Sequence, residues 1–496
     1  MKFYIETVGC QMNTLDSELA SAELISAGWA RVESRKDADL AIFNTCSVRE
    51  HAEEKVYSAL GRLKTWKTSK PGSIIAVMGC MAQKDKDVVF QRAPFVDVVL
   101  GPGKIDQLVS LVTVARTTGE QQLAVGVDRF EQKVDRQTVK DSFRLYDPIR
   151  LPQARPRVFQ AMVRIMFGCD KFCSYCIVPS ARGPEQSRSP HEILNEVRTL
   201  ADQGCLEVTL LGQTVNSYRY REGDKTTRLA DLLAMIDDVP GIQRVRFVSS
   251  YPTDMTDELL QAVRDLPSMT PHLHVPAQHG ANSALKRMRR HYTVEEYRDL
   301  VDRIYATIPG AAITSDVIVG FCGETEEEFQ QTVDLVRYAK FKNSFIFKYS
   351  VRPGAEAARI YEDDVPEDVK KRRNNELLAI QNEISATTNQ SFVGKEVEIL
   401  VEGPSKREAR EQAREEALYA ESEPSDAPEN VDAPGAFVSI DELLATAGSQ
   451  DEVQLMGRTP CDRIVVFNGP REMTGTFRRV KITTAAPFTL FGEIVG

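Results

Sequence analysis

The stretch Gly168-Cys-Asp-Lys-Phe-Cys-Ser-Tyr-Cys176 places three cysteines in a Cys-x3-Cys-x2-Cys pattern directly after a strand expected at Val158–Phe167. Three thiolates at this spacing can bind three irons of a [4Fe–4S] cube and leave the fourth iron open to a small molecule. The alternatives are a zinc site or unrelated core thiols, but structural zinc takes four ligands, commonly from paired Cys-x2-Cys knuckles. The pattern therefore predicts an iron–sulfur cluster held by Cys169, Cys173 and Cys176.

From Arg157 the sequence alternates strands and helices over more than 200 residues, with helices such as His191–Asp202 and Glu326–Ala339. The expected strands are Val158–Phe167, Glu207–Leu211, Val245–Ser249, His272–Val275, Ala312–Val319 and Phe345–Ser350. Roughly six βα units predict an open or closed parallel barrel, in which ligands bind at the carboxyl ends of the strands.

The N-terminal part of the chain also alternates strands and helices. Strands are expected at Lys2–Val8, Leu40–Asn44 and Ser73–Met78, and helices at 17–27 and 49–66. One cysteine follows each strand by a few residues, and the three are Cys10, Cys46 and Cys80. Strand ends at one edge of a parallel sheet lie close together, so these thiols can converge on a metal. The other interpretation is three buried, inert thiols, because free cysteine is among the most buried residue types.

The C-terminal part reads as a small all-β module after a charged helix at Val365–Ala386, with strands expected at Glu396–Val401, Arg463–Phe467 and Thr476–Thr483. Residues 403–452 form an acidic insert between the first two of these strands, and its composition predicts disorder apart from a helix at Lys406–Tyr419. We expect an α/β chain with boundaries at 1–125, 126–156 (a proline-containing linker), 157–388 and 389–496.

Charge and cysteine usage limit the possible environments. Residues 402–452 hold 14 acidic and 4 basic side chains, so this segment accounts for the whole net charge of −10, and basic patches elsewhere remain able to meet phosphate. Nine cysteines, an odd number in a chain of 496 residues, argue against a disulfide framework. No signal peptide and no uncharged apolar run of about 18–20 residues is visible, so we expect a cytoplasmic protein without a membrane partner.

The barrel motif resembles that of the radical S-adenosylmethionine (SAM) enzymes, in which Cys-x3-Cys-x2-Cys follows the first strand of a partial (β/α)6 barrel. The resemblance implies that SAM binds the open iron and is cleaved to a 5′-deoxyadenosyl radical, which abstracts hydrogen from unreactive carbon. It also implies cofactor contacts by Phe172, Gly212 and Gln213, the last two within Leu210-Leu-Gly-Gln-x-Val-Asn216. A glycine at a strand end is more often a plain turn.

The N-terminal motifs narrow this resemblance to the radical SAM methylthiotransferases, MiaB type. They are Gly9-Cys-Gln-Met-Asn-x2-Asp-Ser17, Asn44-Thr-Cys-Ser-Val-Arg-Glu50 and Gly79-Cys-Met-Ala82, and Cys176-Ile-Val-Pro-x2-Arg-Gly183 continues the match in the barrel. The resemblance implies that Cys10, Cys46 and Cys80 hold a second [4Fe–4S] cluster, which handles the inserted sulfur, so that all six cysteines are catalytic.

The C-terminal module resembles a TRAM domain, a small RNA-binding β-barrel, through Gly457-Arg-Thr-x2-Asp-Arg463 and Pro487-x2-Leu-x-Gly492. This resemblance implies RNA contacts by Arg458, Arg463 and Lys481. A solvated charged surface is the alternative. The acidic insert has no counterpart in the family pattern, and Asp462 stands where the family usually has Asn. A basic cluster at 286–290 is either a tRNA contact or a solvated helix face.

The implied reaction converts N6-isopentenyladenosine-37, beside the anticodon in tRNA, to its 2-methylthio derivative; one SAM methylates sulfur and a second supplies the radical. The implied partners are the tRNA anticodon loop and a reductant such as flavodoxin or ferredoxin, with no sulfur donor identified and a monomeric state. The rivals are methylthiotransferases acting on threonylcarbamoyladenosine or on a ribosomal-protein aspartate, and a non-enzymatic iron–sulfur RNA-binding protein. Gln11-Met-Asn13 favours the isopentenyladenosine type.

Overall fold

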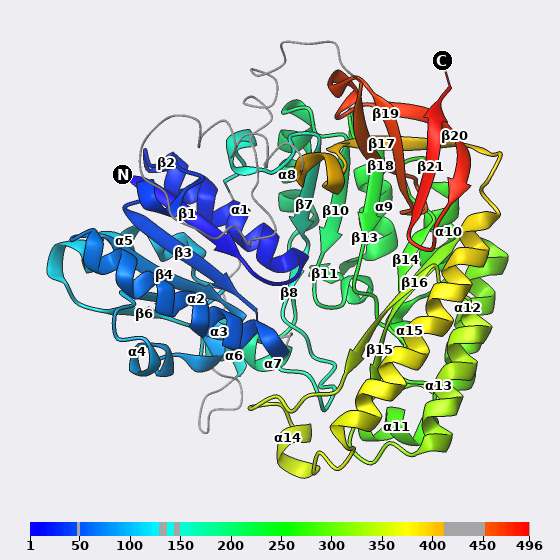
Figure 1. Cartoon of the computed structure of the whole chain (residues 1–496), viewed down its shortest axis with the longest axis horizontal. Coiled ribbons are helices and arrows are strands. Elements are labelled where there is room, and N and C mark those ends of the chain that lie inside the picture. Colours follow the sequence, from blue (N-terminus) through cyan, green and yellow to red (C-terminus); the bar gives the residue numbers. More distant parts are fainter. Residues whose placement is uncertain (47–49, 128–135, 143–148, 411–451, 496) are drawn as a thin grey trace.

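A six-stranded parallel sheet forms the N-terminal domain, with strand order β2-β1-β3-β4-β5-β6. The computed structural model describes residues 1–46, 50–127, 136–142, 149–410 and 452–495 (Figure 1). The strands are β1 (Lys2–Thr7), β2 (Ala30–Arg31), β3 (Leu40–Thr45), β4 (Ile74–Gly79), β5 (Val98–Leu100) and β6 (Gln122–Ala124). The helices are α1 (Gln11–Ser26), α2 (Glu50–Ser69), α3 (Cys80–Asp85), α4 (Val88–Arg92) and α5 (Leu108–Thr118). The fully buried β3 and β4 explain the continuous apolar runs of the sequence, because a parallel sheet is covered on both faces.

The central domain is a partial barrel of six parallel strands, as predicted. It consists of two three-stranded sheets, β13-β10-β7 and β14-β15-β16, which meet where Val245 forms a bridge to Met269. The strands are β7 (Gln160–Arg164), β10 (Glu207–Leu211), β13 (Arg244–Phe247), β14 (His272–His274), β15 (Ala312–Val319) and β16 (Asn343–Lys348). β7 and β16 have no strand partner on their outer edges in these sheets, so the barrel is open on one side.

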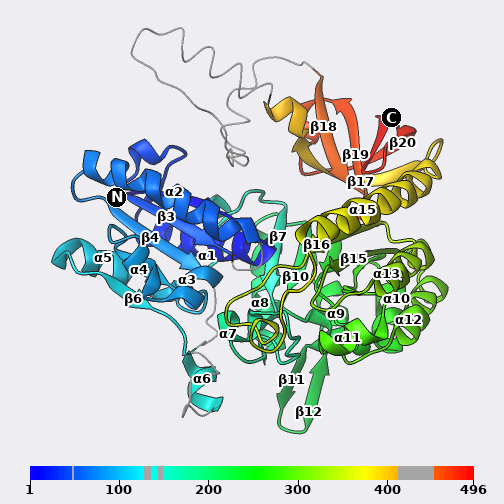
Figure 2. The same ribbon diagram turned by 60° about the horizontal axis from the view of Figure 1, so that its bottom comes forward.

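Helices cover the outside of this barrel, and two short strand pairs lie at its carboxyl end (Figure 2). The helices are α7 (Val178–Arg182), α8 (Pro190–Asp202), α9 (Leu229–Asp237), α10 (Asp257–Asp265), α11 (Asn282–Arg287), α12 (Val294–Thr307), α13 (Glu326–Ala339), α14 (Ala357–Ile360) and α15 (Glu367–Gln390). The strand pairs are β8 (Met166–Phe167) with β9 (Gln186–Ser187), and the hairpin of β11 (Arg219–Glu222) with β12 (Lys225–Arg228).

The C-terminal module is a closed five-stranded barrel with strand order β17-β18-β19-β21-β20. The strands are β17 (Glu396–Pro404), β18 (Val453–Arg458), β19 (Ile464–Gly469), β20 (Phe477–Ala485) and β21 (Thr489–Ile494). The sequence pattern did not predict β18 and β21. Because β17 continues through Pro404, the predicted start of the insert at 403 is wrong; residues 406–410 are helical, and 411–451 lie outside the described residues.

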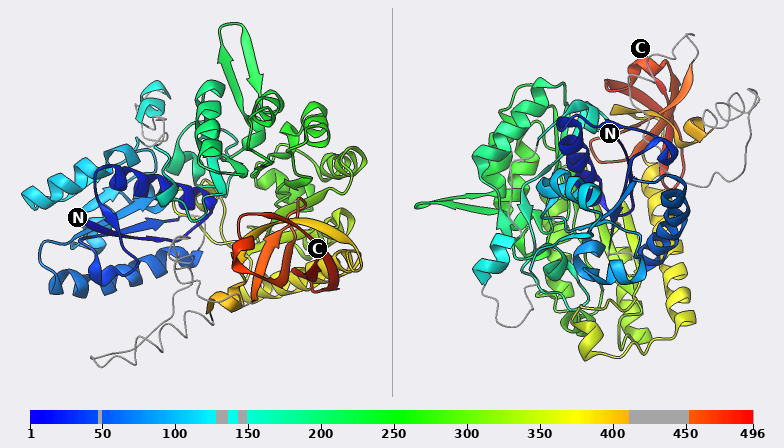
Figure 3. Two further views of the ribbon diagram at one scale, coloured as in Figure 1. Left: turned by 90° about the horizontal axis from the view of Figure 1, so that it is seen from above. Right: turned by 90° about the vertical axis from the view of Figure 1, so that its left-hand side faces the viewer.

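The three domains share buried contacts. Leu211 of the barrel belongs to the hydrophobic core of the N-terminal domain, and Met162 and Val248 pack against it. The predicted linker contributes α6 (Arg136–Ser142) and Arg150, whose Nη2 lies 3.0 Å from the Oε1 atom of Glu18. The N-terminal domain therefore closes against the open side of the barrel (Figure 3). Within the described ranges, no helix is long and apolar enough to cross a membrane.

Candidate active site

The three N-terminal cysteines all stand at the carboxyl edge of the N-terminal sheet. Cys10 precedes α1 after β1, Cys46 follows β3, and Cys80 is the first residue of α3 after β4. Cys46 and Cys80 are buried, whereas Cys10 is exposed. The predicted convergence rests on this topology, because parallel strands end at one edge and the helices that follow begin there.

Polar side chains hold the backbone around these cysteines. The Asn13 Nδ2 atom donates to Asn44 Oδ1 and to the Thr45 carbonyl, both at 2.9 Å, and Cys10 Sγ donates to Asn13 Oδ1 at 3.3 Å. Gly79, before Cys80, has φ of +100°, and a Cβ atom there would lie 2.4 Å from the Thr45 carbonyl oxygen. The motif residues beside the cysteines therefore fix the strand ends that carry them.

The N-terminal thiols influence one another electrostatically. A hydrogen bond with the Cys46 thiol lowers the pKa of Cys10 to about 5, and the nearby Arg182 guanidinium adds to the effect. Burial raises the pKa of Cys80, while Arg182 opposes that rise and the charge of Cys10 adds to it. Cys10 therefore interacts with both Cys46 and Cys80, and thiolates favour a cationic ligand. That the three cysteines bind one cluster stays a prediction.

Arg182 joins this site to the barrel. It lies on α7, and its side chain is almost fully buried. Its Nε atom donates to Cys80 Sγ at 3.3 Å, and its Nη2 atom donates to Asp16 Oδ2 at 2.7 Å. Arg164 of β7 donates to the other Asp16 oxygen at 3.3 Å. A buried carboxylate of α1 is thus clamped between two arginines of the barrel, and one of them also contacts a cysteine.

The barrel cysteines occupy the loop that follows β8. Cys169 is buried, and Cys173 and Cys176 are partly buried. Burial raises the pKa of Cys169 to about 12, and burial together with the charges of Cys173 and Cys169 raises the pKa of Cys176 to about 12. These thiols are close enough to repel one another as thiolates, and a bound metal cluster removes that repulsion.

This donor set fits an iron–sulfur cluster. In the part of the chain that the structure describes, no group of three His, Cys, Asp or Glu side chains is placed to hold a single metal ion. A cluster differs in this respect, because each thiolate binds a different iron of the cube. Two sets of three thiols have the chemistry that two such clusters require.

The basic cluster at 286–290 is only partly an open surface: Lys286 and Arg289 are exposed, whereas Arg287 is partly buried and Arg290 is buried. The Arg287 Nη2 atom lies 2.6 Å from Glu328 Oε2, and Arg289 forms an ion pair with Glu356. Arg290 is buried, and its Nη1 atom donates to Cys173 Sγ at 3.4 Å. Sequence reasoning missed Arg182 and Arg290 as site residues, because each acts on a cysteine more than 100 positions away.

Phe172, Gly212 and Gln213 lie near the barrel cysteines at the carboxyl ends of strands. Phe172 has φ of +53° and is 37% exposed between Lys171 and Cys173. Gly212 follows β10, where a Cβ atom would lie 2.3 Å from Met166 Cγ. The Gln213 Oε1 atom is buried without a hydrogen-bond partner. The buried oxygen and the close packing at Gly212 show a tightly packed strand end, and the SAM contacts stay a prediction.

The predicted RNA-contact residues differ in their surroundings. Arg463 is 6% exposed, and its Nε atom donates to Asn389 Oδ1 at 2.9 Å, so its burial contradicts a surface contact. Arg458 is partly exposed and forms ion pairs with Glu402 and Asp462. The Arg463 side chain joins the C-terminal barrel to α15, and the Arg458 backbone carbonyl accepts from Arg244 of β13 at 3.0 Å. Lys481 is exposed on β20, directly opposite Glu396 of β17.

Aromatic rings line the inner face of the open barrel. Phe345 and Phe347 of β16 are 52% and 43% exposed. Phe345 pairs in register with Asp316 of β15, and its ring lies edge-on to His274 at a centroid distance of 6.5 Å. The His274 Nε2 atom lies 3.5 Å from Asp316 Oδ2. Exposed aromatic faces beside polar edges suit the stacking of a flat base.

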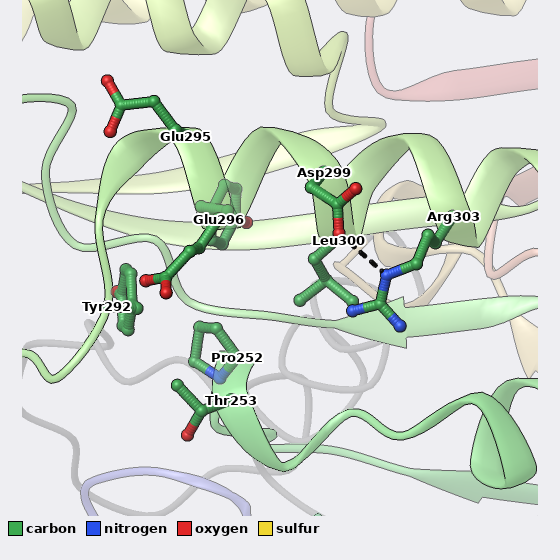
Figure 4. Close-up of a pocket in the computed structure, with 9 residues that line it drawn as sticks. Pro252, Thr253, Tyr292, Glu295, Glu296, Asp299, Leu300 and Arg303 are labelled. Atoms are coloured by element: carbon green, nitrogen blue, oxygen red, sulfur yellow. Dashed lines mark hydrogen bonds and ion pairs between the residues drawn. The ribbon is translucent and has the colours of Figure 1, made fainter.

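A cavity of about 480 Å³ lies between η5 (Pro252–Asp254) and α12 (Figure 4). Its walls include Glu295, Glu296 and Asp299, and Tyr292 separates it from Arg290. It contains no predicted site residue.

A partial parallel barrel whose first strand leads into Cys-x3-Cys-x2-Cys defines a radical SAM enzyme, and residues 163–336 match the radical SAM superfamily. Residues 2–101 match the uncharacterized protein family UPF0004, and residues 442–495 match the TRAM domain. The chain belongs to the tRNA-2-methylthio-N(6)-dimethylallyladenosine synthase family. It is 49% identical to the Rhodopirellula baltica synthase, over 99% of this chain and 95% of the relative, and 39% identical to that of Moorella thermoacetica, over 99% and 98%.

Solved structures share the fold at low sequence identity. The chain is similar to the radical SAM methyltransferase TsrM from Kitasatospora setae with cobalamin and a [4Fe–4S] cluster bound, with a TM-score of 0.50 and 15% identity over 72% of this chain and 77% of that one. It is also similar to the cobalamin-dependent SAM radical enzyme OxsB, with a TM-score of 0.51 and 11% identity over 85% and 71%.

Proposed function

We propose that this chain is a transferase that converts N6-isopentenyladenosine-37 of tRNA to its 2-methylthio derivative. The observation that carries the proposal is the junction between the two cysteine sets, where Arg182 extends from the barrel to Cys80 of the N-terminal domain. Full-length identity of 49% to a tRNA-2-methylthio-N(6)-dimethylallyladenosine synthase supports the same substrate.

The two cysteine sets divide the reaction. Cys169, Cys173 and Cys176 would hold one [4Fe–4S] cluster, for the SAM chemistry, and Cys10, Cys46 and Cys80 would hold a second, for the sulfur chemistry. When bound, these groups supply one-electron cleavage of SAM and a sulfur that can be methylated. An aromatic C–H offers no acidic proton to a general base, so a carbon radical is a chemically reasonable route. Arg182 and Arg290 each place a permanent positive charge against one set of thiolates.

The barrel interior provides the site for the target base. Phe345 and Phe347 offer stacking faces, and His274 and Asp316 offer polar edges. A loop adenine can leave its neighbours at small cost to reach this face. Lys481 on the C-terminal barrel and the neighbouring exposed surface contact the RNA backbone, whereas Arg463 serves the domain interface.

Further partners follow from the chemistry. A flavodoxin or ferredoxin supplies the electrons, the enzyme acts as a monomer, and it works in the cytoplasm, where tRNA is found. The sulfur donor has no assigned binding site on this chain.

Mass spectrometry of tRNA nucleosides from cells that lack the gene tests the substrate. We expect 2-methylthio-N6-isopentenyladenosine to vanish, its unthiolated precursor to accumulate, and both changes to reverse when the gene is restored. An unchanged amount of that nucleoside would contradict the proposal. Loss of 2-methylthio-threonylcarbamoyladenosine, or of a methylthio group on a ribosomal-protein aspartate, would instead identify one of the rival substrates.

A further inference from the structure

The hairpin of β11 and β12 extends away from the body of the barrel (Figures 2 and 3). It begins directly after η4 (Val215–Ser217), which follows the carboxyl end of β10. The Ser217 hydroxyl donates to Asp254, and Asp254 also accepts from Lys171 of the cysteine loop. The Arg219 backbone N–H donates to Ser187 Oγ at 3.1 Å. The root of the hairpin is therefore tied to the loop that carries the barrel cysteines.

The two faces of this hairpin differ. On one face, Tyr220 packs against the barrel core and Thr227 is buried. Alternation along a strand places Arg219 and Arg221 on the other face, together with Arg228, which lies directly opposite Arg219. All three arginines are exposed. The packed face fixes the orientation of the ribbon, so its arginine face is held toward solvent.

The arginine face has no ion-paired acid among the described residues, although the Asp231 carboxylate accepts from the Arg228 backbone N–H at 2.8 Å. Arg219 and Arg228 form a directly opposed cross-strand pair of like charges, an arrangement that destabilises a hairpin. In the described part of the chain, no carboxylate forms an ion pair with any of the three guanidinium groups. Glu258, on α10, interacts with Arg228 only at longer range.

Two other exposed cations of this chain, unlike the arginines of this face, lie directly opposite acids. At the tip of the same hairpin, Lys225 lies directly opposite Glu222. On the C-terminal barrel, Lys481 lies opposite Glu396. An external anion bound to this projecting ribbon would neutralise the like-charge pair and relieve its repulsion.

We propose that the face formed by Arg219, Arg221 and Arg228 binds backbone phosphates of the substrate RNA. The inference rests on the proposed function, which supplies an RNA partner. Alternate residues on a strand lie about 7 Å apart, so the long side chains can reach neighbouring phosphates. Guanidinium groups bind phosphate through paired hydrogen bonds, and they carry no sequence preference when they contact only the backbone. The hairpin positions the RNA while the barrel reads the base.

The experiment compares two triple variants of the full-length, cluster-loaded protein. The test variant is Arg219→Gln/Arg221→Gln/Arg228→Gln. The control, Arg198→Gln/Arg264→Gln/Arg337→Gln, removes the same charge from exposed arginines on the outer helices α8, α10 and α13. Fluorescence anisotropy measures the Kd of labelled tRNA containing N6-isopentenyladenosine-37 across a range of salt concentrations.

Counterion release sets the expected magnitude. Three phosphate contacts contribute about 0.7 to 0.9 each to the slope of log K against log salt. The test variant should make that negative slope less steep by about 2 to 3. It should also weaken binding by about 50- to 150-fold at about 0.15 M salt. The control should stay close to the wild type. The melting temperature of the test variant should not fall, because the substitution removes a like-charge pair.

Two results would overturn the inference: equal tRNA affinity in the test variant and the wild type, or equal losses in the test and control variants. If the test variant binds tRNA normally but is reduced more slowly by an acidic flavodoxin, the face serves an electron-transfer protein and not RNA. A wild-type protein that neither binds tRNA nor forms the methylthio nucleoside refutes the proposed function itself, and this result is distinguishable from all of the others.

Discussion

Replacing Arg182 with methionine is the sharpest test of the junction between the two cysteine sets. The side chain is about 2% exposed, and its guanidinium contacts Asp16 at 2.7 Å and Cys80 at 3.3 Å. Methionine preserves most of the buried volume but removes the charge and both hydrogen bonds. Asp16, which is fully buried, then keeps only the 3.3 Å contact with Arg164.

The magnitude follows from the cost of a buried carboxylate that loses a partner. Breaking a buried ion pair by removing one member costs about 3–5 kcal/mol. Because Arg164 remains, we expect Arg182→Met to lower the free energy of unfolding by about 3 kcal/mol, more than a hundredfold in the folding equilibrium. Arg182→Lys should cost less, since a cation remains although the two-pronged geometry is lost.

The assay has two readouts. Urea unfolding of the apo-protein measures stability. Iron content and electron paramagnetic resonance measure the N-terminal site alone in a background where Cys169, Cys173 and Cys176 are all alanine. Arg246→Met is the matched control: Arg246 is also buried, lies 3.0 Å from Glu207, and joins the barrel to the C-terminal domain.

We expect both variants to lose stability and only Arg182→Met to lose iron or alter the resonance of the N-terminal cluster. The reasoning would be refuted if Arg182→Met left both readouts at their wild-type values. Equal effects of Arg182→Met and Arg246→Met on the N-terminal cluster would also refute the reasoning, because general destabilisation would then explain the loss of the cluster.

The remaining predictions concern the barrel. Hydrogen bonds from Arg287 and Ser283 overcome the effect of burial and lower the pKa of Glu328 to about 2. The ionised carboxylate therefore stabilises the fold above pH of about 4.5, and this stability is lost as the pH falls toward 2. Glu328→Gln should lower the free energy of unfolding by about 1–2 kcal/mol at pH 7, after allowance for solvent screening. In melts of the apo-protein, the difference in stability from wild type should shrink below pH of about 4.5. A difference that does not depend on pH would contradict this prediction. Phe345→Ala should weaken tRNA binding by about 1–3 kcal/mol with little change in melting temperature, whereas Tyr338→Ala, an exposed aromatic on α13, should leave binding unchanged; equal effects would argue against base stacking.

Local sequence patterns predicted most of the fold. Glu207–Leu211, Ala312–Val319 and Glu326–Ala339 were predicted with the bounds that the structure has. Their periodicity is unambiguous because one face, or both faces for the strands, is buried. The short β18 and β21 were missed, since glycine and charged residues interrupt their alternation and closure of the barrel determines their pairing.

The sequence predicted the site only where its residues lie close together in the sequence. The spacing of Cys169, Cys173 and Cys176 needs no tertiary information, because one loop holds all three. Arg182 and Arg463 show the limit. Each reads as an ordinary cation in the sequence, yet tertiary contacts bury one against Cys80 and Asp16 and the other against Asn389. Long side chains that act across domain boundaries leave no local pattern.

The central claim is that two cysteine sets perform two different parts of one reaction. The most direct measurement is a reaction of purified, cluster-loaded protein with SAM, reductant and isopentenyladenosine-containing tRNA, in which 5′-deoxyadenosine and methylthiolated nucleoside are quantified together. The account predicts that a Cys10→Ala/Cys46→Ala/Cys80→Ala variant still forms 5′-deoxyadenosine but no methylthio product. It predicts that Cys169→Ala/Cys173→Ala/Cys176→Ala forms neither. Methylthiolated tRNA from either variant would contradict the account.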